Sequence, residues 1–170
     1  MLVATLTRKI EALSTRPWFI LLGALCLTVA LGVTGSLSGL SAYSADSWSY
    51  FELSKSVFGG DFYRFNTYRS YFSPAYSASF PLGYPVLLAL AQLVFGQQAF
   101  LAPGINIVLA VVTWLLVIRL ARQLGLSSLL GWTLAFSLVL FPFYLDEVFS
   151  GRAIPAAVLL FLAGAGCLMR

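Results

Sequence analysis

The sequence of 170 residues is 60% hydrophobic, has only 9% charged residues and carries a formal net charge of +4. Because a soluble domain has roughly 25% charged residues, this chain has too few to cover a water-facing surface, and we predict an integral membrane protein. The basic residues lie near the ends of hydrophobic segments instead of forming one patch, which argues against binding of nucleic acid. The absence of histidine excludes a Ser-His-Asp triad and any metal site that uses imidazole.

Hydrophobic segments of nearly 20 residues predict four transmembrane helices, because about 20 residues are needed to cross the hydrocarbon core of a bilayer. The expected spans are residues 18–40, 100–120, 127–145 and 153–169. The first is too long for the hydrophobic core of a signal peptide, so we interpret it as a retained anchor. Before it, residues 1–16 place apolar side chains at helical spacing opposite charged ones, which predicts an amphipathic helix on the cytoplasmic membrane surface.

Residues 81–95 form a shorter apolar segment, in which Pro81, Gly83 and Pro85 crowd the first turn. A segment of about 15 residues is more typical of an interfacial or re-entrant helix than of a span. With four spans, the basic residues at span ends are cytoplasmic and most acidic residues are external, as the positive-inside rule requires. The two sets are Arg8, Lys9, Arg16, Arg119, Arg122 and Arg170 inside, and Asp46, Glu52, Asp61, Asp146 and Glu147 outside. We therefore predict a plasma or inner membrane protein with both termini in the cytoplasm.

The first external loop then extends over residues 41–98, and it is rich in Tyr, Trp and Phe. Such a length is unusual for a connection without secondary structure, and Tyr and Trp prefer the headgroup level of a bilayer. We expect interfacial helices at residues 47–58 and 82–95, an irregular stretch at 59–80, and a groove between these helices and the spans. The predicted fold is therefore all-α, with one membrane domain over residues 1–170.

Asp46 is the strongest candidate for a catalytic residue, because it lies just beyond the first expected span. A charged group at this depth is costly unless it is used, and apolar surroundings make a carboxylate a better general base. The alternative is that Asp46 or Ser47 caps the helix at 47–58. The two roles are compatible, since a capping residue can still face the groove.

Asp146 and Glu147 follow Pro142 at the outer end of the third expected span. From there they could reach the same groove and bind a polar substrate or a divalent cation. The alternative is a solvated acidic loop that also caps the fourth span. No cofactor is required by the sequence.

External arginines are candidates for binding a phosphate or an anionic headgroup, since a guanidinium group binds phosphate in a bidentate manner. Arg64 and Arg69 lie in the external loop, and each could instead be a surface arginine at the headgroup boundary. Tyr50 and Tyr84 could donate hydrogen bonds to a sugar, with anchoring at the membrane interface as the alternative.

Two motifs in the external loop resemble a known superfamily. Asp46-Ser47-Trp48-Ser49-Tyr50 opens one expected helix, and Phe80-Pro81-Leu82-Gly83-Tyr84-Pro85 opens the other. This order resembles the first luminal or periplasmic loop of the glycosyltransferase type C superfamily. Its members include the protein O-mannosyltransferases and the aminoarabinose lipid A transferase. The resemblance covers residues 18–165.

The resemblance implies a sugar donor carried on a polyprenyl phosphate and an acceptor hydroxyl on a protein, lipid or glycan. Asp46 matches the catalytic aspartate of the family, which takes the acceptor's proton in a single, inverting displacement. Glu147 matches an acidic residue of the second external loop, whereas Arg64 and Arg69 have no firm counterpart. Members of the family are usually far longer, so we expect this chain to be the N-terminal part of such an enzyme or a shortened relative.

A different class of function is also consistent with the sequence, namely a non-catalytic membrane subunit that binds lipid or a partner protein through the same groove. A small transporter is less favoured, because no expected span has an ionisable residue near its middle.

Overall fold

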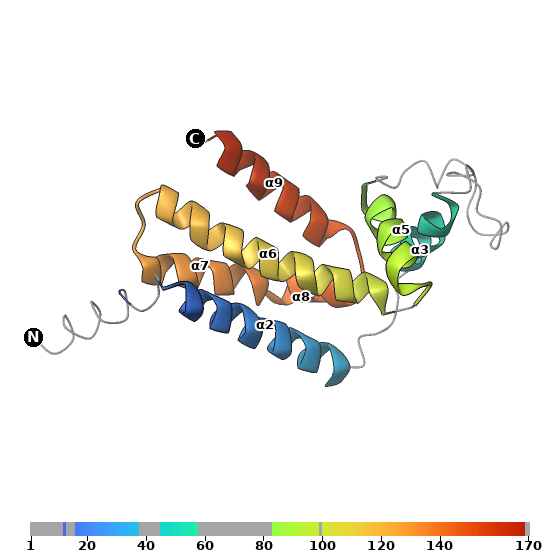
Figure 1. The fold of residues 1–170 in the computed structure, drawn as a ribbon, viewed down its shortest axis with the longest axis horizontal. Coiled ribbons are helices and arrows are strands. Elements are labelled where there is room, and N and C mark those ends of the chain that lie inside the picture. The colour runs from blue at the N-terminus through green and yellow to red at the C-terminus, as the bar shows by residue number, and fades with distance from the viewer. Residues whose placement is uncertain (1–11, 13–15, 38–44, 58–82, 99, 169–170) are drawn as a thin grey trace, which may run out of the picture.

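The computed structural model describes residues 12, 16–37, 45–57, 83–98 and 100–168. Over these ranges the chain forms seven helices and no strand, so the predicted all-α fold class is confirmed (Figure 1). The helices are α2 (Pro17–Leu37), α3 (Ala45–Ser56), α5 (Gly83–Phe95), α6 (Leu101–Gln123), α7 (Ser128–Val139), α8 (Pro142–Phe149) and α9 (Ile154–Leu168).

The central element is α6, which α2, α7, α8 and α9 contact along its length, while α3 and α5 pack together near its N-terminus (Figure 1). Trp114 lies fully buried in the middle of α6. Its ring meets that of Trp132 from α7 edge to face, with ring centroids 5.0 Å apart. Aromatic pairs favour this geometry because the positive ring edge faces the negative ring face. The two tryptophans thereby join α6 and α7.

A glycine in α2 allows that helix to approach the tryptophan pair closely. A Cβ atom at Gly23 would lie 2.8 Å from the ring of Trp132 and 2.9 Å from the ring of Trp114. Real Cβ atoms do not come this close to neighbouring atoms, so only glycine fits without a shift of the helix or of the two rings. Gly23 therefore sets the distance between α2 and the rest of the bundle.

Most of the predicted helices are found close to their expected limits. The two expected interfacial segments correspond to α3 and α5, and three of the expected spans correspond to α2, α6 and α9. Because α3 begins at Ala45, Asp46 lies in its first turn and not ahead of the helix. The amphipathic helix predicted at 1–16 and the irregular stretch at 59–80 lie outside the described residues, apart from Ala12 and Arg16.

The third expected span, 127–145, is wrong as a single helix. It divides into α7 and α8, whose axes are bent by 56°. The break lies at Phe141, which has an extended backbone with φ −60° and ψ 127°, and Pro142 opens α8. Proline has no N–H and disfavours helical backbone at the residue before it, so α7 ends and a new helix starts. Asp146 and Glu147 consequently lie inside a helix, and not in a loop after a span.

Helix length gives a smaller number of membrane crossings than the sequence pattern. Among the described residues, α6 is long and apolar enough to cross a bilayer, and α7 with α8 would make a second crossing if the bent pair is taken as one segment. The apolar helices α5 and α9, and the apolar part of α2 at Leu22–Leu31, are shorter. Length and composition therefore support one or two crossings.

Candidate functional site

The candidate site lies at the end of the bundle where α6 begins. At this end α3 and α5 meet the N-terminal part of α6, and the turn from α8 to α9 lies beside them (Figure 1). Tyr50 comes from α3, Tyr84 from α5 and Glu147 from α8, so three of the predicted site residues are brought to one region by elements far apart in the sequence. A fourth residue, Asn106 of α6, connects them.

Asn106 is fully buried, and its side chain joins four segments of the chain. Its Oδ1 atom accepts a hydrogen bond of 2.9 Å from the Tyr84 hydroxyl. Its Nδ2 atom donates to the backbone carbonyl of Arg152 at 2.9 Å and to that of Glu147 at 3.2 Å, with a longer contact of 3.4 Å to Val148. A buried amide is stable only when its donors and acceptors are satisfied, and here they are.

The Tyr84 hydroxyl donates its proton to Asn106, so Tyr84 has no second proton with which to donate a hydrogen bond to a substrate. The Tyr84 ring is 3% exposed and meets the ring of Tyr50 edge to face, with centroids 5.3 Å apart. Leu88 of α5 and Ala102 of α6 complete the same buried cluster. The two tyrosines therefore fix the α3–α5 pair onto α6, and each presents little surface to a ligand.

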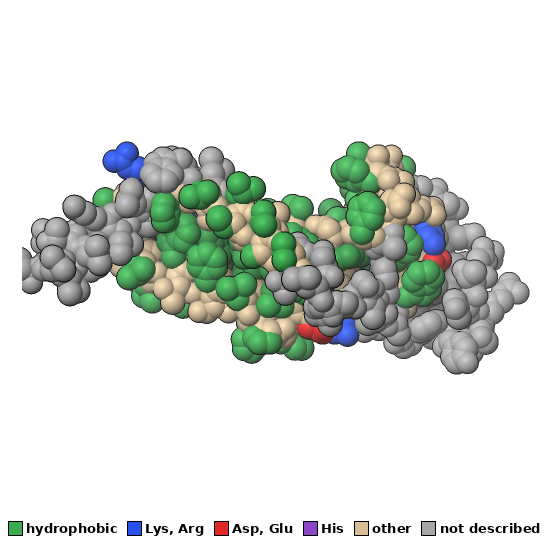
Figure 2. Space-filling view, turned by 90° about the horizontal axis from the view of Figure 1, so that it is seen from below, with side chains coloured by type: hydrophobic (Ala, Val, Ile, Leu, Met, Phe, Trp, Pro, Cys, Tyr) green, Lys and Arg blue, Asp and Glu red, His purple; other side chains and the backbone are tan. Residues whose placement is uncertain are grey.

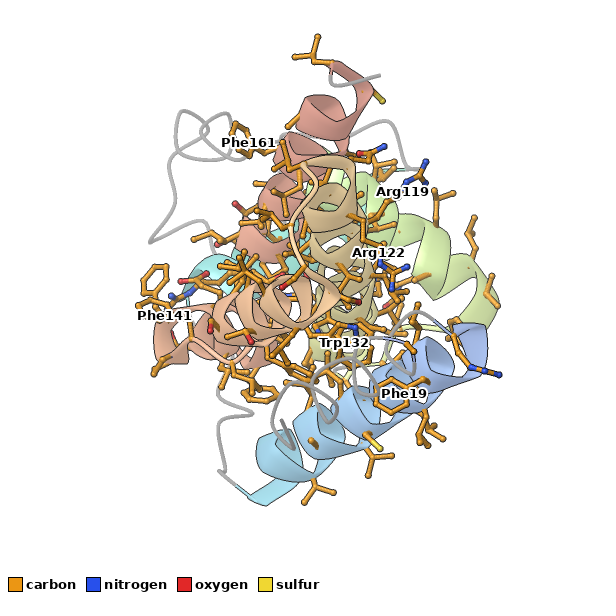
Figure 3. All side chains as sticks on the ribbon, turned by 90° about the vertical axis from the view of Figure 1, so that its left-hand side faces the viewer. Phe19, Arg119, Arg122, Trp132, Phe141 and Phe161 are labelled. Carbon is orange, nitrogen blue, oxygen red and sulfur yellow. The ribbon has the colours of Figure 1, made fainter. Side chains whose placement is uncertain are left out.

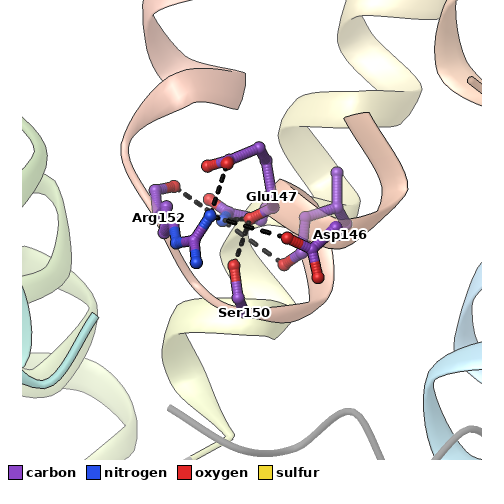
Figure 4. A network of polar contacts seen from close by, with 6 residues as sticks. Asp146, Glu147, Ser150 and Arg152 are labelled. Carbon is purple, nitrogen blue, oxygen red and sulfur yellow. Dashed lines mark hydrogen bonds and ion pairs between the residues drawn. The ribbon is translucent and has the colours of Figure 1, made fainter. Parts of the chain in front are cut away.

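Glu147 is a buried carboxylate held by one arginine (Figure 4). The residue is 2% exposed, and its Oε1 atom accepts a hydrogen bond of 2.6 Å from Arg152 Nη1. The same Nη1 atom lies 3.5 Å from Oδ2 of Asp146, whose side chain is half exposed. The second carboxylate oxygen, Glu147 Oε2, is buried and has no hydrogen-bond partner among the described residues. A buried charged oxygen without a donor is costly, so this atom is the feature of the site that calls for an explanation.

A tight turn between α8 and α9 brings Arg152 back to Glu147. Gly151 has φ +72°, a backbone conformation that favours glycine, and a Cβ there would lie 2.9 Å from the Cβ of Ala102. The backbone N–H of Arg152 donates to the carbonyl of Glu147 at 3.2 Å, which closes the turn. Glycine is thus required both by the turn and by its closeness to α6.

The remaining predicted residues are placed only in part. Asp46 lies in the first turn of α3 by its backbone, but its side chain is outside the described residues. Arg64 and Arg69 also lie outside them. The N-cap alternative for Asp46 or Ser47 does not hold as stated, because the helix begins before both residues.

Asp146 and Glu147 fit a divalent cation poorly. The guanidinium group of Arg152 contacts both carboxylates and already supplies the positive charge that a cation would bring. In the part of the chain that the structure describes, no group of three or more His, Cys, Asp or Glu side chains could hold a metal ion. We therefore assign no reaction step to a divalent cation.

Sequence reasoning missed Asn106 as the connection within this site. The available signal was an amide in the apolar N-terminal half of α6, since polar side chains at such positions often form hydrogen bonds between helices. Its partners could not be read from the sequence, because they lie 22 to 46 residues away along the chain.

No protein-family model matches this chain, and comparisons with curated proteins and with solved structures find no match. The assignment of a function therefore rests on the motifs and the geometry of the chain itself.

Proposed function

We propose that this chain belongs to a membrane glycosyltransferase that moves a sugar from a polyprenyl-phosphate donor to an acceptor hydroxyl on the external face. The observation that supports it best is the buried Glu147 carboxylate, which keeps one oxygen without a partner among the described residues. Glu147 lies close to Asn106 near the start of α6, and α3, which carries Asp46 in its first turn, packs against α5 at the same end of the bundle (Figure 1). Two acidic residues at one external end suit a reaction that needs a base and a group that orients a sugar.

In the proposed reaction, Asp46 accepts the proton of the acceptor hydroxyl as its oxygen attacks the anomeric carbon. The bond between that carbon and the phosphate oxygen breaks, and polyprenyl phosphate leaves with its electron pair, so the configuration inverts. The proposal requires that a sugar hydroxyl reach Glu147 Oε2, which is buried among the described residues, and donate the hydrogen bond that this oxygen lacks. The charge of Arg152 is already balanced by two carboxylates, so Arg64 and Arg69 remain the proposed phosphate-binding residues.

Membrane placement is part of the same proposal, with four crossings, both termini in the cytoplasm and the site outside. Large apolar side chains that face outward support the membrane placement, because their exposure to water costs free energy and their contact with lipid does not. On α2 these residues recur every three or four positions and so form one stripe: Leu22, Leu25, Val29 and Val33. On α9, Leu160 and Phe161 are 72% and 76% exposed. Figure 2 shows apolar side chains across much of one face of the bundle.

A non-catalytic membrane subunit is the second candidate. It is favoured by the internal use of Tyr84, which donates to Asn106, and of Arg152, which pairs with two acidic residues. Groups engaged in this way stabilise the fold whether or not a substrate binds.

The test is transfer of a labelled sugar from a polyprenyl-phosphate donor by membranes that contain the protein, with three carboxylates replaced one at a time. Asp46→Asn should lower the rate by about 10²- to 10⁴-fold, the usual contribution of a general base. Glu147→Gln should lower it about tenfold, as expected for one lost hydrogen bond to a charged group. Glu52→Gln is the matched control, because this acidic residue of α3 pairs with Lys55 and should leave the rate unchanged.

Each result has a defined meaning. A wild-type rate in the folded Asp46→Asn variant would remove Asp46 as the base. A lack of transfer by the wild type with every polyprenyl-phosphate sugar would favour the non-catalytic subunit.

A further inference from the structure

A second feature lies at the opposite end of the bundle from Asn106. A hollow of about 460 Å³ opens there between α2 and the last turns of α6. It is lined by Ile20 of α2 and by Leu115, Ile118, Arg119, Arg122 and Gln123 of α6. None of these residues belongs to the site described above.

The lining residues of α6 form one face of the helix, because they are spaced by three or four positions. Along this face the side chains change from apolar to charged within about 12 Å, the rise of eight helical residues. Leu115 and Ile118 are partly or fully buried, whereas Arg119 and Arg122 are exposed. Figure 3 shows both arginines on the same side of α6, with Phe19 of α2 below them. The hollow thus has an apolar inner wall and a cationic rim.

Among the residues whose side chains the structure describes, the acidic groups are confined to one end of the bundle, where Lys55 and Arg152 pair with them. The sequences of α2, α6 and α7 contain no acidic residue, and Arg16 directly precedes α2 at the same end as the hollow. The acidic residues with described side chains, Glu52, Asp146 and Glu147, belong to α3 and α8. On the face drawn in Figure 2, acidic side chains occur only in the half of the molecule that carries α3 and α8. The end with the hollow is therefore suited to an anion.

We propose that this hollow binds the headgroup and upper acyl chain of an anionic phospholipid. The guanidinium groups of Arg119 and Arg122 and the amide of Gln123 donate to phosphate oxygens, and arginine does so with favourable geometry. Ile20, Leu115 and Ile118 contact the first methylene groups of the chain. A free phosphate ion would gain nothing from these three apolar side chains, whereas basic pockets between membrane helices are suited to lipid headgroups.

The proposal depends on the membrane placement proposed above but not on glycosyl transfer. A failure to find transferase activity leaves it unchanged, because its test measures bound lipid and not a reaction product.

The test is native mass spectrometry of the full chain released from detergent micelles that contain equal amounts of phosphatidylglycerol and phosphatidylcholine. The wild type should retain phosphatidylglycerol at least about tenfold more strongly than phosphatidylcholine, and this comparison needs no substitution. The double variant Arg119→Gln/Arg122→Gln should bind phosphatidylglycerol about 30-fold more weakly. This is the combined effect expected when two arginines each lose the attraction of one basic residue to an anionic headgroup. Since both side chains are exposed, their replacement leaves the core intact.

Two further comparisons separate a built site from general attraction between opposite charges. Arg16→Gln removes an exposed arginine from the same end without touching the hollow, and it should keep the wild-type affinity. Ile20→Trp should weaken phosphatidylglycerol binding with every charge retained, because the indole fills the hollow. Equal retention of the two lipids by the wild type would overturn the proposal, as would equal losses in Arg16→Gln and the double variant. Displacement of the lipid by inorganic phosphate at a similar concentration would assign the site to phosphate and overturn the lipid.

Discussion

Replacing Asn106 by leucine should destabilise the protein more than any other single change at a polar residue of α6. The substitution keeps a side chain of similar size in a fully buried position, so the loss comes from hydrogen bonds and not from a cavity. It removes the 2.9 Å acceptor of the Tyr84 hydroxyl, which keeps only the longer contact of 3.4 Å to the Ala102 carbonyl. It also removes the side-chain donor of the Arg152 carbonyl and one of the donors of the Glu147 carbonyl, which still accepts from the Arg152 N–H. These groups belong to α5 and to the turn between α8 and α9, so one substitution weakens several helix contacts.

The magnitude follows from the number of buried groups left without partners. Each such group costs about 1–3 kcal/mol, and the second lone pair of a carbonyl or a relaxed backbone lowers the sum, so we expect a total of about 3 kcal/mol. Tyr84→Phe removes the hydroxyl itself and should cost about 1 kcal/mol. Both substitutions break the same 2.9 Å bond. The double variant should therefore be more stable than the sum of the two losses predicts, by about 1 kcal/mol.

The measurement is the free energy of unfolding in mixed micelles, obtained by titration with sodium dodecyl sulfate and followed by helical circular dichroism. Thr113→Val is the matched control, because Thr113 is fully buried on the same helix, and among the described residues its hydroxyl has one hydrogen bond, a long one of 3.5 Å from the Tyr144 hydroxyl. It should cost less than about 1 kcal/mol. The reasoning is refuted if Asn106→Leu costs no more than Thr113→Val, or if the losses from Asn106→Leu and Tyr84→Phe are additive.

Two further predictions concern the ion pair and the closest helix approach. Arg152→Leu should lower the free energy of unfolding by about 3–5 kcal/mol, because it leaves the buried Glu147 carboxylate without its cation. Lys55→Leu breaks the more exposed pair with Glu52 and should lower it by less than about 1 kcal/mol. Equal losses of stability in thermal or detergent unfolding would contradict the burial argument. Gly23→Ala should lower stability by about 1–3 kcal/mol, since the added methyl group would meet the two tryptophan rings. Gly104→Ala is the control, because a methyl group there meets open space, and the higher helix propensity of alanine should raise stability by up to about 1 kcal/mol. A stabilising Gly23→Ala would show that α2 can move away from the rings at no cost.

The positions of the helices could be predicted well because they depend on local properties. Apolar length predicted α2, α6 and α9, and the spacing of prolines and glycines predicted where α5 begins. The error at Pro142 had a local cause too. Residues up to 145 were assigned to a single span, but Pro142 opens a separate helix of eight residues, α8, which extends to Phe149.

The candidate site was predicted in its residues but not in its connections. Glu147, Tyr50 and Tyr84 were all named from the sequence, yet their partners were not. The pairing of Arg152 with two carboxylates depends on the turn at Gly151. A glycine in the sequence can indicate such a turn. The direction that the chain takes after the turn, however, is set by the contact of Gly151 with α6.

The sequence by itself predicted the all-α fold class that the described residues confirm, because apolar length and the placement of prolines are local properties and need no knowledge of contacts. It also predicted the positions of α2, α5, α6 and α9 closely, since proline and apolar length act on neighbouring residues. Only the tertiary structure decided which polar groups are satisfied. Asn106 binds groups from three other segments, and Glu147 is buried with one oxygen paired and the other without a described partner. These facts depend on distances between residues far apart in the chain, and packing around α6 sets those distances.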